Sequence, residues 1–175
     1  MNVVIVNRQR TKKINTRLLK QIVGGLFAEL KITEAELGIN LVGAREMTLV
    51  NETFLQHEGS TDVITFDHSS VAASRQSAAV FKKEGSGALP RRRYKLHGEL
   101  FVCMDEAVAQ AKQFGTSWQS EIVRYIVHGI LHLLGHDDLK PGLRRRMKRE
   151  ENRLVRLLAK KFSLAQIAAR SKISA

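Results

Sequence analysis

The sequence predicts an α+β domain in which a mixed four-stranded sheet packs against about five helices. Short apolar runs rich in β-branched residues interleave along the chain with amphipathic segments of helical period. The chain has 175 residues, of which 43% are hydrophobic, and this suits one domain with a sizeable core. A single cysteine, Cys103, excludes an internal disulfide framework and is typical of a reducing compartment.

Four segments have the composition of strands. Residues 2–7 (NVVIVN) and 39–44 (INLVGA) are apolar runs, 62–66 (DVITF) alternates, and 97–103 (HGELFVC) is the fourth candidate. Residues 33–38 (TEAELG), between the first two strands, are interpreted as a turn.

Five segments have the apolar spacing of helices. Their predicted ranges are 16–31 after a cap at Asn15 or Thr16, 45–55, 104–114 closed by Gly115, 117–134 stopped at Gly135, and 141–161. Residues 68–93 lack a convincing period and are predicted to be a loop insertion in a domain that spans 1–161. The remainder, 162–175, is predicted to be a basic C-terminal tail that adds a helical turn or frays.

The net charge of +12 is unevenly placed. Residues 75–95 have seven Lys and Arg against one acid, and 140–175 have twelve against two, whereas the rest has ten against fourteen. This pattern favours binding of a polyanion, nucleic acid before an anionic membrane surface, over a merely solvated helix face. The residues predicted to contact phosphate are Arg91, Arg92, Arg93, Arg144, Arg145, Arg146, Lys148 and Arg149.

Other classes of protein are excluded by what the chain lacks. No apolar run approaches the roughly 18 residues of a membrane span, and the first ten residues do not resemble a signal peptide. We therefore expect a cytoplasmic protein with no membrane contact and no disulfide partner.

The segment V-H-G-I-L-H-L-L-G-H-D-D-L, residues 127–139, has the spacing of a metal site. His128 and His132 lie four apart on a predicted helix, so their imidazoles share one face and can bind one zinc ion. Gly135 can end the helix and turn the chain, which brings Asp138 back as a third ligand. His136 is the rival third ligand, and Asp137 is a candidate acceptor for a ligand imidazole N–H.

Three protein ligands leave a fourth position open, as in catalytic zinc sites. Metalloproteases with an HExxH helix have a glutamate general base after the first histidine, and here that residue is Gly129. Glu121, on the same helix face, is the nearest substitute, but it is expected to be a solvated charge. Phe114 and Trp118, which flank Gly115, are expected to lie in the core.

Residues 128–138, HGILHLLGHDD, closely resemble the signature of the YbeY endoribonucleases, HGxLHLxGYDH. Three further segments resemble the family's motifs in the expected order, so that the resemblance covers roughly residues 2–160. They are NETFL at 51–55 beside the family's NxxY/F segment, STDVITF at 60–66 beside TDVLSF, and GELF at 98–101 beside GDI.

The resemblance implies an α+β fold with one metal ion, usually Zn²⁺, held by the central helix and the loop after it. It implies a single-strand-specific RNA endonuclease with His128, His132 and Asp138 as metal ligands and catalytic centre. It further implies a role in ribosomal RNA maturation, notably at the 3′ end of 16S rRNA, and in ribosome quality control. The implied partners are ribosomal RNA, the small ribosomal subunit and a ribosomal protein or assembly GTPase.

The chain departs from the family pattern at several positions. Asp138 replaces the third histidine and adds negative charge, which admits a divalent ion other than zinc, and His136 replaces a tyrosine. An arginine that often precedes the family's TDV strand is missing from residues 55–57 (LQH). Its role as an RNA contact falls to Arg45 or to the 91–93 cluster, or is lost.

The sequence leaves the mechanism and two other functions open. Either water or the ribose 2′-OH can be the nucleophile, and the general acid is not visible. A non-catalytic RNA-binding assembly factor with a structural metal is the first alternative function. A metalloprotease is the second, although the absent glutamate and the basic charge argue against it.

Overall fold

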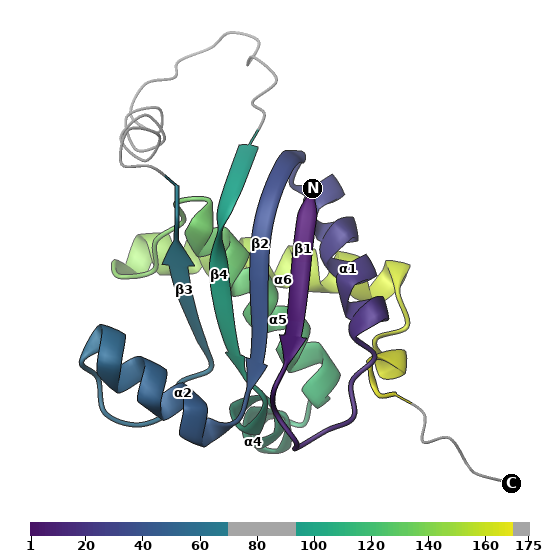
Figure 1. Cartoon of the computed structure of the whole chain (residues 1–175). Helices are drawn as coiled ribbons and strands as arrows, with labels where there is room; N and C mark the ends of the chain where they lie inside the picture. Colours follow the sequence, from purple (N-terminus) through teal and green to yellow (C-terminus); the bar gives the residue numbers. More distant parts are fainter. Residues whose placement is uncertain (70–93, 170–175) are drawn as a thin grey trace, which may run out of the picture.

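The computed structural model describes residues 1–69 and 94–169, and its centre is a four-stranded mixed sheet (Figure 1). The strands are β1 (Asn2–Asn7), β2 (Ile32–Val42), β3 (Val63–Asp67) and β4 (Tyr94–Cys103), in the order β1-β2-β4-β3. The pairs β1–β2 and β2–β4 are parallel, and β3 is antiparallel to β4. The predicted fold class is confirmed. Most of the predicted insertion, 70–93 with Arg91, Arg92 and Arg93, lies outside the described residues, as does 170–175.

Five α-helices surround this sheet in the described part of the chain, as predicted. They are α1 (Thr16–Glu29), α2 (Ala44–Val50), α4 (Met104–Phe114), α5 (Trp118–Leu133) and α6 (Pro141–Lys161). A π-helical turn, η1 (Asn51–Leu55), extends α2, and a 3₁₀ turn, η2 (Leu164–Ile167), follows α6. Side-chain caps fix the N-termini of two helices. Asn15 accepts a hydrogen bond from the backbone N–H of Leu18 at the start of α1, and Ser117 accepts one from that of Ser120 at the start of α5. None of the helices described is long and apolar enough to cross a bilayer.

Alternation along β4 divides the core into two parts. Leu100 and Val102 belong to the larger cluster, which also contains buried side chains of α1, α4, α5 and α6. Phe101 and Cys103 point to the opposite face and join the smaller cluster under α2. The central helix α5 is therefore packed between the sheet and α6, and its position is set by the larger core.

The turn predicted at residues 33–38 is wrong, because this segment is the first part of β2. Two of its polar residues are stabilised from the neighbouring strand. Glu34 faces Lys95 with a side-chain separation of 2.8 Å, and Glu36 faces His97 at 3.7 Å. The Glu34–Lys95 pair joins opposite charges across the two strands, and such a pair favours the strand over the turn that the composition indicated.

Candidate metal centre

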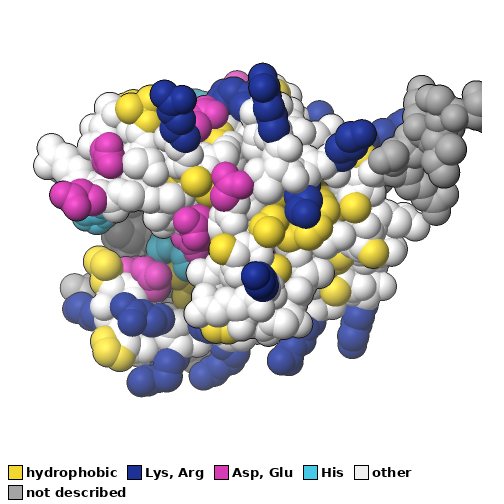
Figure 2. Space-filling model, turned by 90° about the horizontal axis from the view of Figure 1, so that it is seen from below, with side chains coloured by type: hydrophobic (Ala, Val, Ile, Leu, Met, Phe, Trp, Pro, Cys, Tyr) yellow, Lys and Arg dark blue, Asp and Glu magenta, His cyan; other side chains and the backbone are white. Residues whose placement is uncertain are grey.

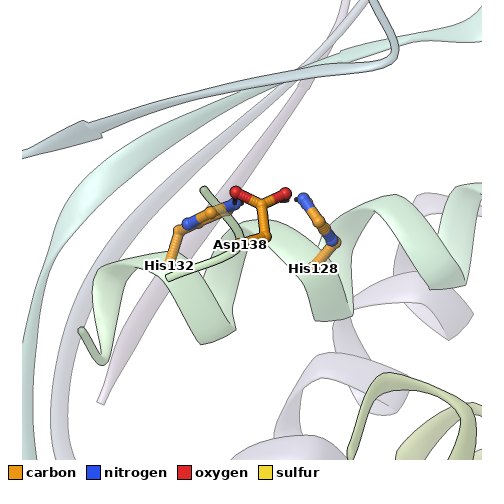
Figure 3. A group of neighbouring side chains, drawn as sticks. All are labelled: His128, His132 and Asp138. Atoms are coloured by element: carbon orange, nitrogen blue, oxygen red, sulfur yellow. Dashed lines mark hydrogen bonds and ion pairs between the residues drawn. The ribbon is translucent and has the colours of Figure 1, made fainter. Parts of the chain in front are cut away.

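Two histidines of α5 and an aspartate of the following loop converge on one point (Figure 3). His128 and His132 lie on successive turns of the helix, and their Nε2 atoms are 3.1 Å apart. One potential ligand atom from each of these histidines and from Asp138 lies within 4.8 Å of the other two. The structure thus brings together the three residues that the spacing predicted as ligands.

The end of α5 explains how Asp138 reaches the histidines. Gly135 has the left-handed φ of +86° that the sequence predicted for a helix-ending glycine. Its N–H donates to the carbonyl of His132, and the N–H of His136 donates to the carbonyl of Leu131, the two bonds of a Schellman motif. The chain turns back here, which places Asp138 Oδ1 3.9 Å from His132 Nε2. The His136 side chain lies outside the group of potential ligands.

The hydrogen bonds of the two imidazoles define their protonation. His128 Nδ1 lies 3.0 Å from a carboxylate oxygen of Glu151, and His132 Nδ1 lies 3.1 Å from the carbonyl oxygen of His136. Both partners can only accept, so each Nδ1 has the proton and each Nε2 of a neutral ring has a lone pair. When both rings are neutral in these tautomers, their Nε2 lone pairs face each other across 3.1 Å, and a shared metal ion would remove the repulsion between them.

The electrostatics of His132 favour the neutral form that binds metals. Burial of the ring, and then the neighbouring His128, lower the pKa of His132 below its ordinary value of 6.5, against the opposite effect of Asp138.

The distance between the two Nε2 atoms also fits a zinc ion. Two nitrogens at about 2.0–2.1 Å from one tetrahedral zinc ion lie about 3.4 Å apart, close to the observed separation. Two imidazoles and one carboxylate are, moreover, a donor set that leaves a coordination position open.

Glu151 of α6 supports the site, although its residue type and position did not predict this role. Its side chain is 3% exposed, and besides His128 it accepts hydrogen bonds from Lys148 Nζ at 2.8 Å and from the Arg124 guanidinium. Burial alone would raise the pKa of Glu151, but the three hydrogen bonds together lower it to about 2. The carboxylate is therefore ionised and holds His128 in the tautomer that presents Nε2 to the metal.

The sequence does contain a pattern that indicates a buried role for Glu151. The apolar positions of the basic helix, Met147, Leu154 and Leu158, define its buried face, and Glu151 falls four residues after the first of them. An acid on the buried face of an otherwise basic helix indicates a buried partner.

A groove of about 680 Å³ runs past the metal group, between the start of β3 and helices α4, α5 and α6. Histidine and acidic side chains gather in a hollow of the surface, with Lys and Arg side chains spread around it (Figure 2). Of the predicted phosphate contacts, Arg144 and Lys148 line this groove. Arg145, Arg146 and Arg149 are exposed on α6 but do not line it.

The structure shows that three smaller expectations, for Glu121, Phe114 and Asp137, are wrong. Glu121 is buried rather than solvated, because it accepts a 2.6 Å hydrogen bond from Thr116 and lies 3.6 Å from the Arg124 guanidinium. Phe114 is 64% exposed in the groove and not in the core. Asp137 accepts from the backbone of Leu139 rather than from a ligand imidazole.

Gly129 lies where α5 packs closely against the sheet. A Cβ atom at this position would lie 2.7 Å from Leu100 Cδ2 and 3.1 Å from Thr65 Cγ2. The residue after the first histidine therefore faces packed side chains of the sheet, and a glutamate could not be accommodated there as a general base.

Gly129→Ala is expected to lower the free energy of unfolding by about 1–3 kcal/mol, because the added methyl overpacks the buried Leu100 side chain. Gly24→Ala in α1 is the matched control, since nothing lies within 4 Å of a Cβ there. It should stabilise by about 0.5–1 kcal/mol through helix propensity. Urea unfolding of both variants measures the difference, and equal effects would contradict the packing argument.

The sheet order and the His-His-Asp group define an α+β domain with a candidate metal centre on its central helix. The family model described as endoribonuclease YbeY matches residues 2–159. This chain belongs to the YbeY family, as the motif resemblance predicted.

Individual relatives agree with this assignment. Proteins named endoribonuclease YbeY from Myxococcus xanthus and Elusimicrobium minutum are 32% and 31% identical to it over 79% and 80% of its length. The chain spans 42% of the Myxococcus protein and 86% of the Elusimicrobium protein. A Thermotoga maritima protein solved in solution has the same fold, with a TM-score of 0.60 at 19% identity over 99% of this chain and 100% of that one.

Proposed function

We propose that this protein is a metal-dependent endoribonuclease that cuts single-stranded RNA. The observation that carries the proposal is the convergence of His128 Nε2 and His132 Nε2, 3.1 Å apart, with the carboxylate of Asp138, in a chain of the YbeY family. His128, His132 and Asp138 would hold Zn²⁺, or another divalent ion that accepts a carboxylate. Such an ion supplies Lewis-acid polarisation of a phosphoryl oxygen and activation of water.

The charges of the groove support RNA as the substrate. Arg144 and Lys148 present cationic groups along the wall formed by α6, on the same groove as His128 and Asp138. The exposed Arg145, Arg146 and Arg149 extend the positive surface along the helix. Contacts of this kind bind phosphates without reading sequence, and a strand laid along α6 would pass the metal group. Arg91, Arg92 and Arg93 remain predicted contacts of the same kind.

The cellular role that we propose is maturation of ribosomal RNA in the cytoplasm, including the 3′ end of 16S rRNA, together with ribosome quality control. The family membership and the basic charge support a ribosomal RNA substrate on the small subunit. A ribosomal protein or an assembly GTPase would then be the protein partner. Peptidase activity has less support, because Gly129 packs against the sheet and supplies no base.

Cleavage of a labelled single-stranded RNA tests the proposed activity. The purified protein should cut it, leave the matching duplex intact, lose activity with a chelator and regain it with added Zn²⁺. Casein serves as a second substrate and should stay intact. Activity that survives chelation would contradict the proposal, whereas chelation that unfolds a protein with no nuclease activity would favour the assembly factor.

The ends of the products identify the nucleophile in the same experiment. Attack by water leaves a phosphate at one new end and a hydroxyl at the other, without a cyclic product. Attack by the ribose 2′-OH leaves a 2′,3′-cyclic phosphate. We expect the first result, and detection of the cyclic phosphate would exclude attack by water.

A further inference from the structure

Phe114 is a solvent-exposed aromatic side chain in the groove of the candidate metal centre. It is the last residue of α4, before Gly115 in the left-handed conformation, and it is 64% exposed. It lines the groove that His128 and Asp138 also line. An exposed aromatic ring in a concave, partly apolar site is typical of a ligand contact rather than of a packing residue.

The polar groups near Phe114 have unused hydrogen-bonding capacity. Gln110 lies one turn earlier on α4, lines the same groove, and its amide has no hydrogen-bond partner among the residues described. Tyr125 also lines the groove, and its buried hydroxyl is without a partner in the described part of the chain. The amide offers a donor and an acceptor side by side, which is the pattern that the edge of a nucleobase presents.

Helix α6 supplies positive charge that is complementary to a phosphate group. Arg144 donates from Nε to the carbonyl of Asp138 at 3.0 Å, and no hydrogen bond of its terminal nitrogens is found in residues 1–69 and 94–169. Lys148 is 59% exposed while it bonds Glu151. A groove with an aromatic ring and an amide on α4, and two cations on α6, matches a nucleotide, with base toward α4 and phosphate toward α6.

We propose that Phe114 and Gln110 form a subsite for one unpaired nucleobase of the RNA strand, which stacks on the Phe114 ring with its polar edge at the Gln110 amide. The inference rests on the proposed function, because it places the substrate of that same metal centre. Bases in an A-form duplex are stacked and paired, so a subsite of this kind accepts single strands only.

Steady-state cleavage of a short single-stranded RNA by Phe114→Ala, Phe114→Trp and Phe54→Ala tests the subsite in the metal-loaded protein. Loss of stacking should raise the KM of Phe114→Ala about tenfold with a smaller change in kcat. Phe114→Trp should keep the wild-type KM. Phe54→Ala is the matched control, since Phe54 is 63% exposed and lies outside the groove.

A set of RNAs with one abasic nucleotide at successive positions locates the base. At one position the abasic substitution should raise the wild-type KM and leave that of Phe114→Ala unchanged, as expected for two partners of one contact. An unchanged KM for Phe114→Ala, or a penalty that no abasic position removes, would overturn the subsite while leaving the nuclease assignment intact. A wild-type protein that cuts no RNA would instead overturn the proposed function, and the subsite with it.

Discussion

His132→Ala is expected to abolish both metal binding and RNA cleavage while the fold persists. The variant keeps only His128 and Asp138 of the potential ligands, and its metal affinity should fall by more than the roughly 10–100-fold that the loss of a supporting contact causes. The lost hydrogen bond to the His136 carbonyl should cost only about 1 kcal/mol of folding free energy. Metal content, RNA cleavage and thermal unfolding of the purified variant measure the three effects.

His136→Ala is the control for this prediction. It removes a neighbouring imidazole outside the group of potential ligands, and the carbonyl that orients His132 stays in place. This variant should bind metal and cut RNA as the wild type does. Loss of metal from His136→Ala would make His136 the third ligand in place of Asp138. Equal cleavage by wild type and His132→Ala would remove the support for the endonuclease assignment, since a contaminating ribonuclease cuts equally in both preparations.

Glu151→Gln is expected to weaken metal binding about 10–100-fold and to destabilise the protein by about 2–4 kcal/mol. The amide keeps the volume but no longer supplies the charge that fixes the His128 tautomer and neutralises Arg124 and Lys148. The destabilisation stays moderate because Lys148 is exposed and Arg124 also lies 3.6 Å from Glu121. Metal titration and urea unfolding at neutral pH measure the two losses.

The same variant has a characteristic pH dependence. The pKa of Glu151 falls from its ordinary 4.5 to about 2 on folding, so folding favours the ionised form. The resulting stability is complete above about pH 4.5 and is lost as the pH falls towards 2. Metal-free wild type and Glu151→Gln should therefore differ by a constant amount at neutral pH and converge below pH 4.5. A difference that stays constant down to pH 3 would contradict the role given to the carboxylate.

Most of the fold was predictable because it follows local periodicity. The helices at 104–114 and 141–161 were predicted to the residue, and those at 16–29 and 118–133 to within two residues. The first half of β2 was not, because its polar residues are stabilised by Lys95 and His97, some sixty residues away. Only the register of the sheet places those partners opposite each other.

The residues of the candidate site also fall into two groups, those that local spacing predicted and those that depend on how the helices pack. His128, His132, Gly135 and Asp138 lie within one helix and its terminal turn, so their spacing alone predicted that they meet. Glu151 comes from a separate helix, and its contact with His128 depends on how α6 packs against α5. Phe114 was expected in the core because aromatic residues usually are, but the end of α4 projects it into the groove.

Gly129 lies between the two histidines in the sequence of α5, and it packs against Leu100 and Thr65 of the sheet. The sheet therefore limits where α5 can hold the two imidazoles. A side chain at this position would displace α5 from the sheet, and with it the helix turns that hold both imidazoles. If the site binds a metal ion as proposed, folding and metal binding would be linked, and each would stabilise the other by the same free energy. A variant chosen only for better packing of the core around Gly129 would then also change the affinity of the proposed site for metal.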